Sequence, residues 1–497
     1  MKKNAGIYKN TVLLSLLSVL ERALGFFYRV VLARLLGAEG LGVYQIAVSH
    51  FFVLRTFGGG GIPVTLSRTV AKEKANGNRK ASEASLSASL VLSLCITLPL
   101  TLFFLFFSGK IPALQADGTL LKILVVSLPF ACAYAAMKGY FWGNKEFMAP
   151  ALFEFFEEIV MTALGTGILI AAGSFTPAQG AQFAAIAMSA SCIFSCIVAL
   201  FALFKRKIKF ASPKTHVKPL FLSSLPITAV RSGATLVGSA VAVLLPAMLV
   251  AAGSTEAEAL AAFGVAAGMV MPLLTMPMTV IGSLSTVLVP ELSEAHAKKD
   301  GRKLSLGIEK GLTFAALISC ALLPLFSAVG YELGSVTYGN LLAGEMLEKT
   351  GLLLLPMSLC AVAQSMVNSL GFEKQSFLFS CAGSAIFLLC VFLLPRFVGI
   401  YAYPIGLGAE FTVCAVCGLV FLGKKCPPSS AFYKKLAGAL ALALPLTLFG
   451  KTALQVCLRL MGEPFALISA ALLTVAATIG LFSAFGFFQK KELQKIF

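Results

Sequence analysis

Apolar runs about 20 residues long recur along almost the whole chain, with short polar segments between them. One helix needs roughly 20 residues to cross the hydrocarbon core of a membrane, so about fourteen crossings fit in the 497 residues. Only 12% of the residues are charged, against about 25% in a soluble protein, and the mean hydropathy is +0.89. Because backbone amides in lipid must be paired within the structure, the runs predict helices. We predict an all-α polytopic membrane protein of about fourteen transmembrane helices.

The first apolar run follows three lysines and continues through Arg22 and Arg29 without a small-residue cleavage site, so we expect a retained span and not a signal peptide. No loop is long enough for a soluble domain, and the longest outer one, Tyr331–Thr350, has room for a short helix. The predicted spans begin near Lys9, Gly40, Ser85, Leu121, Ala149, Gly180, Lys218, Ala257, Leu304, Gly351, Gln375, Tyr401, Leu436 and Phe465.

The net charge of +18 is concentrated in alternate polar segments. This alternation is the bias that places basic loops in the cytoplasm. We therefore expect a multi-pass protein of the plasma membrane with both termini in the cytoplasm, and basic loops that attract anionic membrane lipids. Charge placed in this way does not predict nucleic-acid binding. The basic segments are Arg68–Lys80, Lys205–Lys218, Lys298–Lys303, Lys424–Lys435 and Lys490–Lys495.

Two proline-centred features recur at one offset, because Pro63 and Pro290 are 227 residues apart and so are Pro129 and Pro356. The offset predicts a six-span lobe at residues 1–217, a second six-span lobe at 218–430, and an additional helix pair with a cytoplasmic tail at 431–497. Each lobe has an even number of spans, so the repeat is parallel. Transporters built in this way bind substrate in a central cavity between the halves.

Cysteine and histidine form no recognisable metal or redox motif. Cys414 and Cys417 form a CxxC inside an apolar run without a second pair, and the twelve cysteines are best interpreted as small packing residues. The three histidines are scattered along the chain. We expect no metal and no cofactor.

Charged residues inside the apolar runs are the candidate functional residues. Arg22 and Arg29 share one face of the first span, Arg55 lies in the second span and Arg231 in the seventh. Each costs about 3 kcal/mol at the bilayer centre, which predicts surroundings of protein or water. Snorkelling from a helix end is the alternative for Arg231, and Glu21 can neutralise Arg22.

Three carboxylates share one face of the fifth span, in the segment FEFFEEIV. Glu154, Glu157 and Glu158 can couple transport to a proton or another cation, or they can pair with the arginines. Solvation near the inner surface is a third interpretation. We favour pairing.

A cavity rich in arginine predicts an anionic cargo. The guanidinium group offers rigid paired donors that match phosphate oxygens, so a pyrophosphate headgroup fits best. A cavity for cationic drugs needs net negative charge instead. A membrane-embedded enzyme of envelope polymer assembly needs carboxylates or histidines clustered in a loop, and we find no such constellation. We therefore do not expect an enzyme.

Several segments resemble the polysaccharide-transport and stage V sporulation protein B family, within the multidrug, oligosaccharidyl-lipid and polysaccharide exporter superfamily. The resemblance covers most of the first ten spans. It rests on RALGFFYRVVLARLLGAEGLGVYQ at Arg22–Gln45, GIPVTLSR at Gly61–Arg68, KGYFWGNKEF at Lys138–Phe147 and MVMPLLTMPMTVIGSLSTVLVPELSEAH at Met269–His296.

The resemblance implies the fold of lipid II flippases, in which two six-helix lobes enclose a cavity with alternating access. It implies movement of a polyprenyl-pyrophosphate-linked oligosaccharide or peptidoglycan precursor to the outer leaflet, with a link to sporulation. Arg22, Arg34 and Arg55 match the flippase arginines on spans one and two, and Tyr28 stands where lipid II flippases can carry an arginine. A cation-coupled multidrug exporter of the same fold is the alternative function. We expect a monomer, with envelope-synthesis enzymes as candidate partners.

The stretch LRTFGGGGIPVTLSR places Gly58, Gly59, Gly60, Gly61 and Pro63 in the second span. It lacks the Lys-Ser/Thr of a phosphate-binding loop. The glycines and the proline predict either a hinge or a notch for close helix packing, and both interpretations stay open.

Overall fold

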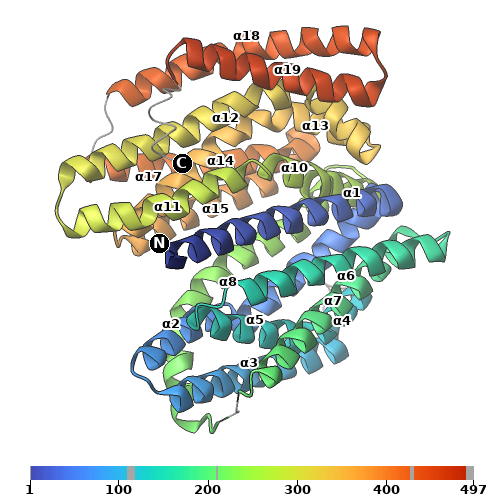
Figure 1. Cartoon of the computed structure of the whole chain (residues 1–497). Helices are drawn as coiled ribbons and strands as arrows, with labels where there is room; N and C mark the ends of the chain where they lie inside the picture. The colour runs from blue at the N-terminus through green and yellow to red at the C-terminus, as the bar shows by residue number, and fades with distance from the viewer. Residues whose placement is uncertain (1, 109–117, 209–210, 426–429, 488–497) are drawn as a thin grey trace. The chain divides into compact units, whose positions relative to one another are not determined.

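The computed structural model describes residues 2–108, 118–208, 211–425 and 430–487 (Figure 1). Within these ranges all regular structure is helical and no strand is present. The basic segment Lys490–Lys495 lies outside the described residues. The predicted fold class, an all-α polytopic membrane protein, is confirmed.

Two compact units divide the chain, the first comprising Met1–Pro246 and Thr255–Gly264 and the second Ala247–Ser254 and Val265–Phe497. The helices that begin in the first unit are α1 (Lys2–Gly59), α2 (Ile62–Ala75), α3 (Arg79–Phe107), α4 (Gly118–Val126), α5 (Leu128–Gly143), α6 (Met148–Ala172), α7 (Pro177–Lys205), α8 (Lys214–Ala251) and α9 (Glu256–Phe263). A π-helical segment, Gly264–Val270, leads into the second unit, whose α-helices are α10 (Met271–Thr275), α11 (Met278–Ala297), α12 (Gly301–Tyr338), α13 (Leu341–Thr350), α14 (Leu354–Ser369), α15 (Glu373–Leu393), α16 (Pro395–Val398), α17 (Ala402–Lys425), α18 (Ser430–Leu460) and α19 (Glu463–Ala484).

Eleven helical segments among the described residues are long and apolar enough to cross a membrane, or twelve when the bent pair α4–α5 counts as one span. From the third predicted span onward, each predicted start falls inside one of these segments. The first two predicted spans lie on α1, which is not among them. Gly37 divides α1 into two helices, because its φ of 71° and ψ of 179° are not helical. The total of fourteen spans stays a prediction.

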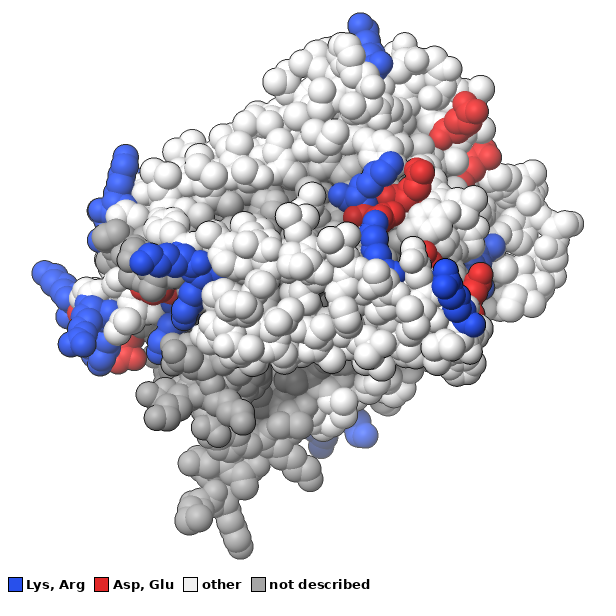
Figure 2. All heavy atoms as spheres, turned by 90° about the horizontal axis from the view of Figure 1, so that it is seen from above, with Lys and Arg blue, Asp and Glu red and all other residues white. Residues whose placement is uncertain are grey.

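Most of the face seen in Figure 2 is uncharged, and the charged side chains on it stand in separate groups. Polar residues at the ends of helices supply hydrogen bonds that lipid cannot. Thr176 and Gln179 form a capping box at the start of α7, and Thr255 and Glu258 form one at the start of α9. These caps satisfy backbone amides in the first turns of α7 and α9.

Three of the four prolines in the repeated features lie at breaks in the helices. The pair α4–α5 bends by 41° at Ser127, just before Pro129, and Pro356 lies in the first turn of α14, after a 3₁₀ turn at Gly351–Leu353. The chain also breaks between α1 and α2 before Pro63, whereas α11 continues through Pro290. The predicted lobes at 1–217 and 218–430 and the pair at 431–497 stay a prediction.

Each unit has its own core of buried apolar side chains. In the first unit, Leu66 of α2, Leu86 of α3 and Phe141 of α5 belong to one cluster with residues of α7. In the second unit, α18 and α19 pack on each other and on α12, where Leu317, Leu446 and Phe482 are buried together.

Candidate functional site

Three helices of the first unit, α1, α5 and α6, bring the charged residues of the apolar runs together. Glu21 interacts electrostatically with Arg22 on its own helix, with Lys138 of α5, and with Glu154 and Glu157 of α6. The same kind of interaction joins Glu158 to Arg29, and Glu157 to Arg55 in the second half of α1. We call the eight side chains of these residues the charged cluster: Glu21, Arg22, Arg29, Arg55, Lys138, Glu154, Glu157 and Glu158.

The closest ion pair in the charged cluster joins the ammonium group of Lys138 to the carboxylate of Glu154. The Lys138 ammonium also lies 4.8 Å from the centroid of the Trp142 ring, one helical turn further along α5. Lys138 was not among the predicted site residues. Its position inside the apolar run LPFACAYAAMKGYFWG was the signal that could have identified it.

Glu158 lies against α1 at a glycine. A Cβ atom on Gly25 would lie 2.8 Å from the Oε1 atom of Glu158. Gly25 follows Arg22 by three residues and precedes Arg29 by four, so the three positions share one face of α1. The absent side chain at Gly25 therefore admits a carboxylate between two arginines.

Glu157 lies deeper in the protein than Glu158 does, next to α7. The Sγ atom of Cys192 donates to its Oε1 atom at 3.7 Å, and the Ser195 hydroxyl also interacts with the carboxylate. The Arg55 side chain is half-buried, and its carbonyl oxygen accepts from the Sγ atom of Cys132 at 3.6 Å. Arg55 and Glu157 thus belong to a partly buried layer of the charged cluster.

Formally, the charges of the cluster cancel, because it contains four basic and four acidic side chains. The excess of arginine predicted from the sequence is therefore not a property of these eight residues. Exposure divides them in another way, since the side chains of Arg22 and Arg29 are exposed and the four carboxylates are half-buried. The accessible charge is positive.

Arg231 lies apart from the charged cluster. Its Nη1 atom donates to the carbonyl oxygen of Gly60 at 2.7 Å. Tyr28, at the position of the flippase arginine, is 3% exposed and packs against Gly165 of α6. Arg34 is exposed and has a polar partner of its own. A role of any of these residues in binding stays a prediction.

The four glycines run from the last turn of α1, with Gly58 and Gly59, through the break before α2, with Gly60 and Gly61. A Cβ atom on Gly58 would lie 2.5 Å from the Cγ2 atom of Thr97, and one on Gly61 would lie 2.3 Å from the carbonyl oxygen of Ser224 in α8. The amide of Gly61 donates to the Oγ1 atom of Thr228 at 3.0 Å. These contacts agree with the packing notch, and the hinge at Gly58–Gly61 and Pro63 stays a prediction.

Two segments that carry the family resemblance pack on each other. A Cβ atom on Gly139 of α5 would lie 2.5 Å from the carbonyl oxygen of Pro63, and one on Gly143 would lie 2.8 Å from that of Ser67. The GxxxG spacing therefore lets α5 approach α2 closely.

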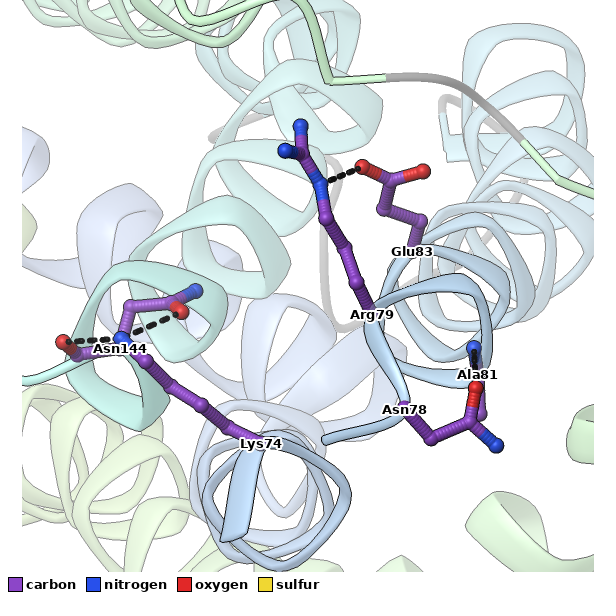
Figure 3. Close-up of polar contacts among 6 residues, drawn as sticks. All are labelled: Lys74, Asn78, Arg79, Ala81, Glu83 and Asn144. Carbon is purple, nitrogen blue, oxygen red and sulfur yellow. Dashed lines mark hydrogen bonds and ion pairs between the residues drawn. The ribbon is translucent and has the colours of Figure 1, made fainter. Parts of the chain in front are cut away.

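Polar contacts join the end of α2 to the end of α5 and cap the start of α3 (Figure 3). Lys74 of α2 donates to the carbonyl oxygen of Asn144 at 3.3 Å and to its Oδ1 atom at 3.2 Å. The Asn78 side chain accepts from the amide of Ala81 and caps α3, where Arg79 and Glu83 form an ion pair at 2.8 Å.

No group of three or more metal-ligating side chains occurs among the residues that the structure describes. Cys414 of the CxxC is buried, and its Sγ atom donates to the carbonyl oxygen of Phe379 at 3.2 Å. That contact is typical of a packing residue in a helix bundle.

Two sporulation proteins of Bacillus subtilis (strain 168) are similar in sequence. Stage V sporulation protein B is 28% identical over 352 residues, which cover 67% of this chain and 67% of that protein. Sporulation protein YkvU is 24% identical over 306 residues, which cover 58% of this chain and 66% of that protein.

Solved structures share the fold. The structure described as lipid II flippase MurJ in an inward closed conformation matches with a TM-score of 0.71 and 17% identity, over 95% of this chain and 98% of that one. An inward-facing multidrug resistance MATE family transporter of the MOP superfamily matches with a TM-score of 0.66 and 16% identity, over 84% of this chain and 95% of that one. At these identities the likeness establishes the transporter fold.

The family described as polysaccharide biosynthesis protein matches residues 7–296, which include the charged cluster, the glycine break and the paired helices α2 and α5. This match spans more than half of the chain, and it agrees with the sporulation relatives and with the fold. The chain therefore belongs to the polysaccharide biosynthesis protein family.

Proposed function

We propose that this protein is a flippase that moves a polyprenyl-pyrophosphate-linked oligosaccharide or peptidoglycan precursor across the plasma membrane by alternating access. The family, the sporulation relatives and the fold shared with a lipid II flippase support the proposal. The observation that carries it is the exposed guanidinium face of α1, where Arg22 and Arg29 flank Glu158.

The chemistry of that face suits a phosphate diester or a pyrophosphate. A guanidinium stays charged and offers paired donors that match phosphate oxygens. Glu158 interacts electrostatically with Arg29, so a carboxylate neighbours the guanidinium face. Such an arrangement binds and orients its cargo without breaking a bond, so we propose a transporter without enzymatic activity.

A cation-coupled multidrug exporter is the second candidate. Four carboxylates inside one helical unit favour it, since they offer binding positions for a proton or a cationic compound. The fold shared with a multidrug resistance transporter is compatible with this function.

The location and the partners follow from the proposed function. We place both termini in the cytoplasm because of the basic alternate loops. The protein would act as a monomer among membrane lipids and receive its cargo from enzymes of envelope synthesis, with no role for nucleic acid.

A flipping assay in proteoliposomes tests the proposal. Defined polyprenyl-pyrophosphate-linked sugars are loaded into one leaflet, and their appearance in the other leaflet is measured for the wild type, Arg22→Ala, Arg29→Ala and Arg55→Ala. Arg459→Ala is the matched control, because Arg459 is an exposed arginine in the last turn of α18. We expect a loss of tenfold or more in the first three variants. Normal flipping in all of them, or transport of cationic dyes alone, would overturn the flippase.

A further inference from the structure

An apolar cavity of about 190 Å³ lies in the first unit, at the break between α1 and α2. Three elements line it: Phe57 and Ile62 from the break, Leu92 and Ile96 from α3, and Phe221 and Leu225 from α8. All three helical elements are part of apolar runs that the sequence places in the membrane. The cavity therefore opens within the hydrocarbon region or at its inner edge.

The glycines create this space. Gly58 and Gly59 line the cavity without side chains, and the contacts of α8 with the other helices are sparse. The helix α8 is held at Gly61, where Ser224 and Thr228 meet the broken backbone. The cavity remains beside that contact because no side chain from the glycine run fills it.

Hydrocarbon is the occupant that the lining favours. An apolar cavity of about 150 Å³ in another protein stays dry and admits benzene, because water finds no polar partner there. Of the hydroxyl groups at the wall, those of Thr228 and Ser224 have hydrogen-bond partners, and that of Ser232 has none among the described residues. A methyl-branched chain can fill such a space, whereas a hydrated ion cannot.

The guanidinium group of Arg231 lies at the edge of the cavity. Arg231 precedes Ser232, which lines the cavity, and its Nη1 atom is bound to Gly60, next to lining residue Gly59. A guanidinium has five N–H donors, and the contact with Gly60 uses one of them. The side chain is exposed, and none of the ion pairs among the described residues includes it. Its remaining donors belong to an exposed side chain and match a phosphate.

We propose that this cavity is an entry site that holds the isoprenoid chain of a polyprenyl-phosphate lipid, with Arg231 on its phosphate. This site is separate from the charged cluster, and the inference rests on the proposed flippase function. A cavity for hydrocarbon next to a guanidinium recognises the phosphate of such a lipid and the isoprene units beside it. Loading the chain beside α8 would bring the phosphate to the glycine break before the headgroup reaches Arg22 and Arg29.

Photo-crosslinking of the full-length protein in nanodiscs tests the entry site. The probe is a polyprenyl pyrophosphate with a diazirine on its chain, and labelled peptides are identified by mass spectrometry. We expect labels on α3 around Leu92 and on α8 between Phe221 and Ser232. Ala229→Trp, which fills the cavity, should lower this labelling at least tenfold, whereas Ala234→Trp, at an exposed position of α8 outside the lining, should not change it.

Two further comparisons of labelling are needed. One distinguishes recognition of the phosphate from recognition of the isoprenoid chain, and the other distinguishes the substrate from ordinary membrane lipid. Arg231→Ala should lower labelling by the pyrophosphate probe about tenfold and leave labelling by the corresponding uncharged polyprenol unchanged. A phosphatidylglycerol probe with a diazirine on its acyl chain should label these peptides weakly. Equal labelling by phosphatidylglycerol, or wild-type labels that lie elsewhere, would overturn the entry site.

The flipping assay keeps the two proposals distinguishable. Normal flipping together with labels away from α3 and α8 rejects the entry site and leaves the flippase. Specific labels on α8 in a protein that flips no precursor support the binding site and reject the flippase. Thermal unfolding of Ala229→Trp and Ala234→Trp checks that both variants fold, and the wild-type labelling pattern does not depend on either.

Discussion

The Nη1 atom of Arg231 lies 2.7 Å from the carbonyl oxygen of Gly60, where α1 has ended and α2 has not begun. One residue later, the amide of Gly61 donates to the Oγ1 atom of Thr228. A helix break exposes backbone groups that lipid cannot satisfy, and each unpaired group costs several kcal/mol. Here side chains of α8 satisfy both groups, so the break and α8 stabilise each other.

Gly61→Ala should destabilise the protein by about 1–3 kcal/mol, the usual cost of overpacking. The new Cβ atom would lie 2.3 Å from the backbone carbonyl of Ser224, which cannot move aside without shifting α8. The midpoint of thermal unfolding in detergent measures the effect. Gly233→Ala in α8 is the matched control, because a Cβ atom there meets nothing within 4 Å. Equal midpoints for the two variants would refute the close contact.

Lys138→Met and Glu154→Gln should each lower the free energy of unfolding by about 2 kcal/mol, since each leaves one unpaired charge between membrane helices. The cost is below the roughly 3–5 kcal/mol of a fully buried pair because the side chains are 22% and 27% exposed. The double variant should recover most of the loss. Chemical unfolding of all four proteins completes a double-mutant cycle. The exposed pair Glu294–Lys298 is the control and should show no measurable coupling. Additive losses at Lys138 and Glu154 would mean that the pair is not formed.

Glu158→Gln should tighten the binding of a pyrophosphate lipid threefold to tenfold, or about 0.6–1.4 kcal/mol, because Arg29 loses a neutralising partner. Titration of a fluorescent polyprenyl pyrophosphate measures the change. Glu463→Gln, at the exposed start of α19, serves as the control. If the protein is instead a drug exporter, Glu158→Gln should weaken the binding of cationic compounds, since a carboxylate that binds cations is lost. Weaker cation export with unchanged lipid binding would favour that alternative.

Tyr28→Phe should leave stability unchanged or raise it slightly, because the buried Tyr28 hydroxyl has no hydrogen-bond partner in the part of the chain that the structure describes. Gly165→Ala should destabilise, since its Cβ atom would lie 2.1 Å from that hydroxyl oxygen. Combining the two changes should restore part of the loss. Thermal midpoints of the three variants decide the matter, and a large loss in Tyr28→Phe alone would show that the hydroxyl is bonded.

The helical fold could be predicted from the sequence because lipid imposes both the length and the composition of a span. The boundary between the first two spans was predicted near Gly40, close to the break that the structure has at Gly37. Pro129 and Pro356 did mark irregular points, since proline removes a backbone donor wherever it stands.

The candidate site was predictable only in its residue types. Arg22 and Arg29 were placed on one face correctly, because helical spacing fixes that relationship. The contact of Arg231 with Gly60 could not be predicted, since its acceptor is a backbone oxygen that a helix break exposes 171 residues away. Lys138 of α5 pairs with Glu154 of α6 and balances the charge of the cluster. This pairing could not be predicted, because sequence spacing does not tell which helix lies opposite α6.

The two hydrogen bonds at the glycine break also constrain how α8 can leave. Parting Arg231 from Gly60 and Thr228 from Gly61 exposes a carbonyl and an amide at once, and hydrocarbon offers neither a partner. Separation therefore needs water at the break, because water can donate to the carbonyl oxygen and accept from the amide. Movement of α8 away from the break therefore requires water there. Without water, the two hydrogen bonds hold α8 against the break.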